Sequence, residues 1–207
     1  METLKSLSDM FTPDERNDSL VNYNFSSNSF EKASIEIHYE NISRIMLNDD
    51  VPEGIKSGFS TSQNLLLYSW YVYPFIVIAE LNAIACLEFA LKTRIMSEDI
   101  LCNVKVMGLR KSMLYAIEKG WLQDAGVADI IKTDDGAKAY YEFAGLIREE
   151  VVPESDPQAY IKILADALPK IRNELAHGTP MLWPGGYGTL RLVARLINQL
   201  WRYPVGA

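Results

Sequence analysis

An arginine, an asparagine and a histidine near the C-terminal end of the chain have the chemistry to act on a phosphodiester. Arg172, Asn173 and His177 fall in the stretch Arg-Asn-Glu-Leu-Ala-His-Gly, which ends at Gly178. Histidine has an unperturbed pKa of about 6.5, so it can take and return a proton near neutral pH. The planar fork of arginine matches the oxygens of a phosphate. These side chains could therefore cleave RNA through its own 2′-hydroxyl, and neither a metal nor a cofactor is expected.

The residues before this stretch predict the helix that must carry it. A single apolar seam with spacings of three and four is formed by Ile161, Leu164, Leu168, Ile171 and Leu175. Pro157 suits the first turn of this helix, and Gly178 suits its C-terminal cap. Pro169 interrupts the pattern, so it should kink the helix or begin a second one.

The helix geometry limits how the motif can converge. Asn173 and His177 are one turn apart and share a face, whereas Arg172 and His177 are about 140° apart around the axis. Convergence requires that Arg172 reaches round the helix, that the helix loosens at His177, or that a second subunit supplies the same pair. In a converged site His177 would be the general acid or base and Arg172 would stabilise the phosphorane. Asn173 would position the phosphate or the imidazole.

A purely structural interpretation uses the same residues. A histidine at a helix C-terminus interacts favourably with the helix dipole, and Asn173 could serve as a cap. Arg172 could pair with Glu88 or Glu80 inside a helical bundle. Those two glutamates lie two turns apart on one predicted helix face, which is either solvated and salt-bridged or uses Glu88 to orient Arg172.

Residues 172–178, at the end of a late helix, resemble the signature of the HEPN superfamily (higher eukaryotes and prokaryotes nucleotide-binding). Residues 79–94 are similar to the long HEPN helix that packs against the motif, and the resemblance covers roughly residues 64–203. It implies an all-α helical bundle that dimerises, with Arg172 and His177 of both subunits in one shared cleft. Asn173 matches the polar residue that often follows the arginine.

The resemblance implies two kinds of function. Many HEPN proteins are metal-independent endoribonucleases of toxin–antitoxin or phage-defence systems, whereas others bind RNA, a nucleotide or a protein partner without catalysis. HEPN toxins paired with a nucleotidyltransferase antitoxin often carry a tyrosine two residues after the histidine. Thr179 stands there in this chain, which departs from that subclass. The expected partners are a second copy of the chain, RNA, and an antitoxin or regulatory protein.

The segment after the motif offers candidate substrate contacts. Trp183 and Tyr187 could stack on bases, although filling a hydrophobic seam is the preferred interpretation. A last helix is predicted over residues 188–202, and its Arg191 and Arg195 lie one turn apart with Arg202 further on. This cationic strip could contact RNA. A basic helix over residues 105–119 is a second candidate, although a plain solvated face is the preferred interpretation.

Composition restrains these expectations. The chain has 207 residues and a net charge of −7, so it does not resemble a general nucleic-acid binder, and RNA would need a local basic patch. This acidic balance favours the non-catalytic alternative. Cys86 and Cys102 lie in apolar surroundings without metal-ligand spacing, which fits buried thiols in a reducing cytoplasm. No apolar signal region is found at the N-terminus.

Two parts are expected, a less regular N-terminal extension over residues 1–60 and a HEPN-like helical domain over residues 61–207. The extension is predicted to hold a short helix near residues 14–21, a helix over residues 39–47 and a turn over residues 49–58. Residues 63–96 are very apolar, yet Glu80 and Glu88 would be costly in lipid, so a long central helix kinked near Pro74 is predicted instead of a membrane span. Further helices are predicted over residues 124–132 and 136–149.

Overall fold

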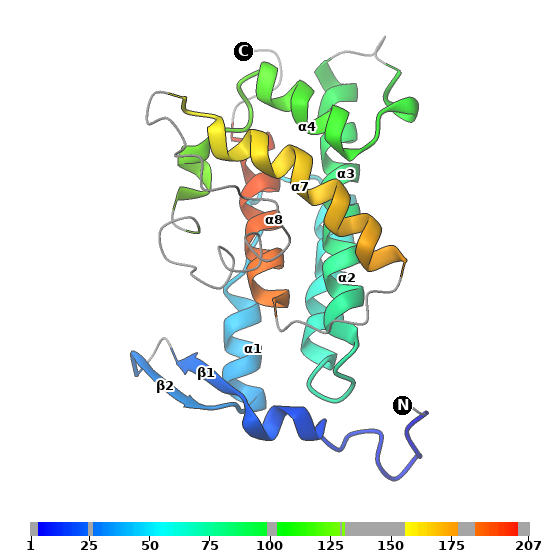
Figure 1. Ribbon diagram of the computed structural model, residues 1–207, viewed down its shortest axis with the longest axis vertical. Coiled ribbons are helices and arrows are strands. Elements are labelled where there is room, and N and C mark those ends of the chain that lie inside the picture. The colour runs from blue at the N-terminus through cyan, green and yellow to red at the C-terminus, as the bar shows by residue number, and fades with distance from the viewer. Residues whose placement is uncertain are drawn as a thin grey trace.

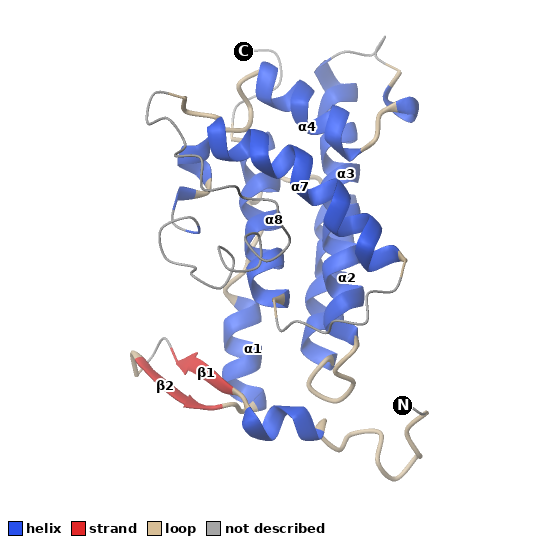
Figure 2. Ribbon diagram, in the orientation of Figure 1, coloured by secondary structure: helices blue, strands red, loops and turns tan. Residues whose placement is uncertain are grey.

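The described part of the chain is mainly helical. The computed structural model describes residues 4–24, 27–98, 103–128, 130, 156–177 and 185–202. Its helices are α1 (Ile35–Ser43), α2 (Glu53–Tyr68), α3 (Phe75–Glu98), α4 (Leu109–Glu118), α7 (Ala159–Ala176) and α8 (Gly186–Leu200). The predicted all-α class is confirmed in this coarse form, with one β-hairpin in addition (Figure 2).

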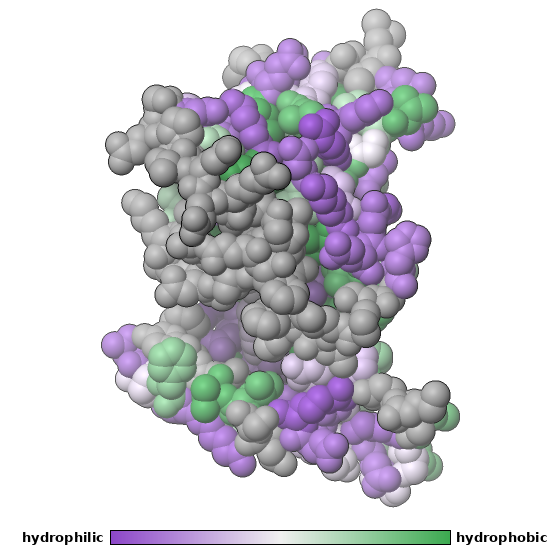
Figure 3. Space-filling view, viewed as in Figure 1, coloured by the Kyte–Doolittle hydropathy of each residue, from purple (hydrophilic) through white to green (hydrophobic). Residues whose placement is uncertain are grey.

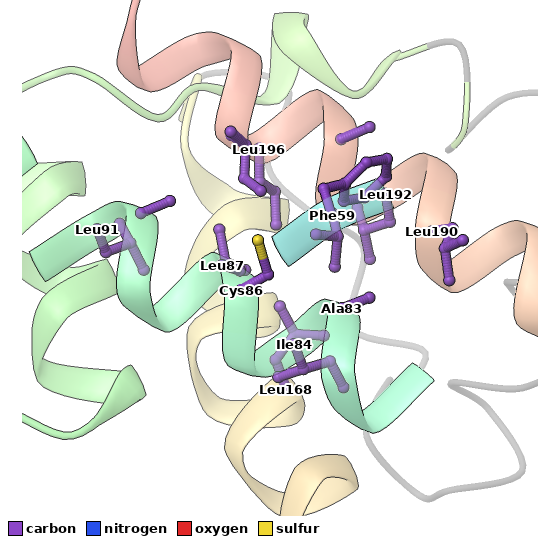
Figure 4. Packing of buried hydrophobic residues seen from close by; sticks show 14 of the residues in the cluster. Phe59, Ala83, Ile84, Cys86, Leu87, Leu91, Leu168, Leu190, Leu192 and Leu196 are labelled. Atoms are coloured by element: carbon purple, nitrogen blue, oxygen red, sulfur yellow. The ribbon is translucent and has the colours of Figure 1, made fainter. Parts of the chain in front are cut away.

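Helix α3 is the centre of the bundle. It packs against α2, α4, α7 and α8 (Figure 1). Its Ile84, Leu87 and Leu91 have no solvent exposure, and they meet Phe59 of α2, Leu168 of α7 and the leucines of α8 in one core (Figure 4). A helix that is apolar on most of its circumference must be surrounded by other elements, which explains this position.

The predicted long central helix is wrong in one respect. The chain forms two helices, α2 and α3, which are joined by a turn over residues 69–74 and pack side by side. Helix α2 ends at Tyr68, and Pro74 stands directly before the first residue of α3. Because proline lacks a backbone N–H and disfavours a helical conformation at the residue before it, a helix starts after Pro74 instead of passing through it. Gly58 lies in the α2–α3 contact, where a Cβ would be at ordinary van der Waals distance, 3.4 Å, from Sγ of Cys86 on α3.

The predicted turn over residues 49–58 ends earlier than expected, because α2 begins at Glu53. Pro52 stands at its N-cap, and a glutamate in the first turn favours a helix start. The expected boundary between residues 60 and 61 falls inside α2. Buried residues before and after that point belong to one hydrophobic core, among them Ile42, Ile55, Leu66 and Leu87.

The N-terminal region is more regular than expected. Helix α1 begins four residues before the predicted helix at residues 39–47, because the side chain of Ser34 caps it by accepting the N–H of Ile37. The short helix near residues 14–21 is a 3-10 helix, Glu15–Ser19. Strands β1 (Val21–Asn24) and β2 (Ser29–Lys32) form an antiparallel hairpin that the sequence did not predict.

The later helices are close to their predicted positions. Helix α7 runs through Pro169 without ending there. Helix α4 is shorter than predicted and follows a 3-10 turn, Val104–Val106, while α8 begins and ends two residues early. A 3-10 turn, Asp124–Gly126, starts the segment predicted over residues 124–132, and residues 136–149 lie outside the described residues. None of the helices described is long and apolar enough to cross a membrane.

Candidate functional site

The motif occupies the last turn and the C-cap of α7. The five apolar residues of the predicted seam are buried, and they face α3 and α4. Arg172, Asn173 and His177 lie on the remaining surface and are exposed. The outward side of α7 is accordingly hydrophilic in the space-filling view (Figure 3). Folding of the helix therefore depends on the seam, and the polar motif remains accessible to a ligand.

Arg172 lies beside Glu88 of α3. Its Nη2 atom is 3.9 Å from Oε2 of Glu88, and the arginine side chain is 45% exposed. Glu88 also accepts a hydrogen bond of 2.6 Å from Nζ of Lys92, one turn further along α3. Glu88 therefore forms a salt bridge with Lys92 along α3, and its charge also faces Arg172. At 3.9 Å the attraction is electrostatic and is not a hydrogen bond.

His177 is the C-cap of α7. Its backbone N–H donates to the carbonyl of Asn173 at 3.0 Å, and its φ and ψ are −88° and 1°. The predicted capping residue, Gly178, lies outside the described residues. Among the residues described, no hydrogen bond or ion pair joins the side chains of Arg172, Asn173 and His177 to one another. The end of α7 thus presents three exposed groups whose side chains do not converge.

Arg191 and Arg195 lie elsewhere. Both line a cavity of about 380 Å³ between α8 and the C-terminal end of α1. The lining of this cavity includes none of the three motif residues. The cationic strip expected beside the motif is therefore part of a separate surface.

Tyr187 packs in the interior and does not stand free for base stacking. Its hydroxyl donates to Nδ1 of His38, and the two rings are edge to face with centroids 5.5 Å apart. On the other ring nitrogen, Nε2 of His38 donates to the carbonyl of Leu66 at 2.8 Å. This agrees with the preferred interpretation of Tyr187 as part of a seam. Trp183 lies outside the described residues.

His38 itself is buried, because it is only 7% exposed. Burial lowers the pKa of His38 and raises the pKa of Tyr187. No local pattern signals this, since its main partner is 149 positions away.

Glu80 is also buried, which the sequence did not indicate. It is 5% exposed and accepts a hydrogen bond of 2.8 Å from the hydroxyl of Thr189 on α8. Burial raises the pKa of Glu80 to about 7. Glu80 and Glu88 therefore do not share a solvated face: the first points toward α8 and the second toward Arg172 on α7.

The basic helix α4 is partly neutralised by the motif helix. Nε of Arg110 lies 2.5 Å from a carboxylate oxygen of Asp166 on α7. Cys86 is buried as predicted, and burial raises its pKa to about 11, whereas Cys102 lies outside the described residues. No cluster of three or more candidate metal ligands occurs in the ranges that the structure describes.

Comparisons of the chain with family models, with curated proteins and with solved structures found no match. The HEPN resemblance therefore stays a prediction from the motif and its helix.

Proposed function

We propose that this chain is a metal-independent endoribonuclease whose active site is completed by a second copy of itself. The observation that carries the proposal is that α7 has a buried apolar face and an exposed polar motif. The apolar seam is buried in the core, while Arg172, Asn173 and His177 stay exposed together at the helix end. A guanidinium and an imidazole are the groups required for a transesterification at phosphorus.

A second copy is needed because one helix end holds its Arg and His on different sides. Helix α3 offers a surface for that copy. Ile78, Phe89 and Met96 are 47%, 54% and 55% exposed. Spacings of 11 and 7 residues place all three within about 20° of one line along the helix. Phe89 lies about 100° round the helix from Glu88, so a partner covering this apolar line would pack beside the face of α3 on which Glu88 meets Arg172.

The paired motif would divide the reaction between two histidines. One imidazole would remove the proton of the 2′-hydroxyl as its oxygen bonds to the neighbouring phosphorus. The other would protonate the departing 5′-oxygen, leaving a 2′,3′-cyclic phosphate and a free 5′-hydroxyl. Arg172 would donate to the nonbridging oxygens, on which negative charge accumulates. Glu88 would hold the guanidinium near α3 without binding it tightly.

The test is cleavage of a mixed-sequence RNA by the purified protein in EDTA. Arg172→Ala and His177→Ala should abolish cleavage, whereas Lys170→Ala, an exposed residue of the same helix, should retain it. Far-UV circular dichroism checks that each variant is folded. Cleavage that survives both motif substitutions would overturn the proposal, as would no cleavage by the parent chain.

A non-catalytic module for RNA, nucleotide or a regulatory protein is the second candidate. It is favoured by the net charge of −7 and by the separation of the motif side chains within one subunit. In that case the parent chain would bind its ligand in EDTA and leave it intact. An antitoxin would be a partner of the same kind, because it would cover the exposed motif.

A further inference from the structure

A groove with basic walls runs between α8 and the end of α1. The cavity beside Arg191 and Arg195 adjoins a second one of about 440 Å³, because the linings share Asn48, Arg195 and Asn198. The second cavity continues to Arg202 at the end of α8. We refer to the two cavities together as the α1–α8 groove.

The described lining of the groove is basic, although the chain as a whole is acidic. Arg44, Arg191, Arg195 and Arg202 line it, which is four of the nine arginines in the sequence. Arg44 also forms an ion pair with Glu40 one turn earlier on α1. Among the described lining residues there is no aspartate or glutamate, although the chain holds 27 acidic residues against 20 basic ones. A local basic patch of this kind is what an acidic protein requires to hold a polyanion.

The groove is held in shape by amide contacts. The backbone N–H of Asn48 donates to Oδ1 of Asn198 at 2.8 Å, and Nδ2 of Asn198 donates to the carbonyl of Met46 at 3.1 Å. Asn198 thereby fastens the chain after α1 to α8. A wall fixed before binding loses less entropy when a ligand arrives.

The arrangement of the arginines suits a row of phosphates. Arg191 and Arg195 are one turn apart, about 6 Å along α8, and Arg202 lies just beyond the C-terminal end of that helix. Arginine binds phosphate oxygens through two parallel hydrogen bonds. No aromatic side chain is present among the described lining residues, so the groove has no platform for stacking bases.

We propose that the α1–α8 groove binds the phosphate backbone of a single RNA strand, independently of its sequence. The ligand's identity as RNA rests on the proposed function, but the groove is separate from the motif on α7. The groove would hold the strand, and the motif would act on it.

The experiment measures RNA binding by His177→Ala, which keeps the groove and cannot cleave. Oligouridylate and oligoadenylate are titrated over a range of salt concentrations. In this background, Arg191→Ala with Arg195→Ala should weaken both complexes roughly tenfold or more and reduce the salt slope by about 1.4, or about 0.7 per lost phosphate contact. Arg202→Ala alone, outside the helix, should reduce the slope by about 0.7.

Two controls distinguish RNA binding in the groove from a general effect of the net charge of the protein. Lys105→Ala with Lys111→Ala removes two exposed cations near α4 and should leave affinity and slope almost unchanged. Arg191→Lys with Arg195→Lys should preserve most of the slope, because the charges remain. Equal losses in the α4 control and the groove variants would overturn the inference, and so would an unchanged slope in the groove variants.

Competition identifies the source of the phosphate. A mononucleotide or inorganic phosphate should compete far more weakly than the oligonucleotide, and equal competition would overturn the strand proposal. The outcome is independent of catalysis. Groove-dependent binding with no cleavage by the parent chain would keep this inference and overturn the ribonuclease, whereas cleavage with groove-independent binding would do the reverse.

Discussion

The hydroxyl of Tyr187 donates a hydrogen bond to Nδ1 of His38, which joins the start of α8 to α1 across 149 positions of sequence. Because Nε2 of His38 donates to the carbonyl of Leu66, the imidazole is bonded at both nitrogens in its neutral form. The bonded ring connects α1, α2 and α8. It therefore fixes the beginning of α8 against the bundle.

Tyr187→Phe should lower the free energy of unfolding by about 1–3 kcal/mol, because the buried Nδ1 of His38 loses its donor. Urea denaturation at neutral pH measures the difference. Tyr39→Phe is the matched control, since Tyr39 is on α1 and 59% exposed, and it should change stability little. Equal stability of Tyr187→Phe and the parent chain would show that the hydrogen bond contributes nothing net.

Glu80→Gln should flatten part of the pH dependence of stability. The pKa of Glu80 rises from 4.5 to about 7 on folding, so the folded state binds the extra proton between those values. Stability is therefore lost as pH rises through this window, by about 3 kcal/mol in total. Glutamine cannot ionise and still accepts the hydrogen bond from Thr189.

The measurement for Glu80 is the difference in unfolding free energy between parent and Glu80→Gln from about pH 4 to about pH 8. The difference should shift in favour of the variant as pH rises. His38 acts in the opposite direction, because its lowered pKa makes acid destabilising, but it cancels in the difference. Parallel curves for the two proteins would mean that Glu80 titrates normally.

Mixing two inactive variants tests whether the site is shared between subunits. Arg172→Ala and His177→Ala should each lower the cleavage rate by about 10²–10⁴-fold. Arg172→Ala should cost less than about 1 kcal/mol of stability, because its ion pair is exposed and long. Mixed dimers would retain one arginine and one histidine in a common cleft. If that histidine serves first as base and then as acid, the mixture should be more active than either variant alone, although less active than the parent chain with its two histidines.

The control for the mixing experiment pairs Arg172→Ala with the double variant Arg172→Ala/His177→Ala. That mixture contains no Arg172 and should stay inactive. Analytical ultracentrifugation establishes that subunits exchange under the assay conditions. If subunits exchange but cleavage activity is not regained, Arg172 and His177 do not act across the two subunits of a shared site.

Two glycines at helix starts should respond to alanine in opposite directions. A Cβ on Gly186 would lie 2.6 Å from Cδ1 of Leu66 and 3.2 Å from Cγ2 of Ile76, whereas nothing lies within 4 Å of one on Gly54. Gly186→Ala should therefore cost about 1–3 kcal/mol by overpacking. Gly54→Ala should gain about 0.4–1 kcal/mol, because the unfolded chain loses freedom. Melting temperatures that move together would contradict the contact at Gly186.

What the sequence predicted correctly was encoded locally. The helix that carries the motif follows from five apolar residues in one periodic seam, and all five are buried on α7, together with Ala165 and Ala167. The start of α2 was missed because Pro52, Gly54 and Gly58 resemble a turn, although buried Ile55 and Phe59 continue a helical face through them. The proline and glycines of this segment favour a turn, whereas its apolar residues favour a helix. Packing of those apolar residues in the core stabilises the helix.

Features that depend on distant partners could not be predicted. The β1–β2 hairpin pairs two strands of only four residues each through backbone hydrogen bonds, and strands this short give little side-chain pattern to recognise. The burial of Glu80 depends on Thr189, 109 positions later, and the burial of His38 depends on Tyr187. The α1–α8 groove was visible only as two arginines one turn apart, because its other wall comes from the far end of the sequence.

Pro169 weakens the connection between the last turns of α7 and the rest of the helix. It has no N–H, so the carbonyl of Ala165 loses its usual helical donor. The residues beyond it depend on Ile171 and Leu175, which are both buried, for their attachment to the core. Amide hydrogens after Pro169 should consequently exchange with deuterium sooner than those at Leu164 and Leu168. Arg172 and His177 thus lie on a short segment that should unfold locally more easily than the rest of α7. A ligand that binds both side chains should slow the amide hydrogen exchange of the residues after Pro169.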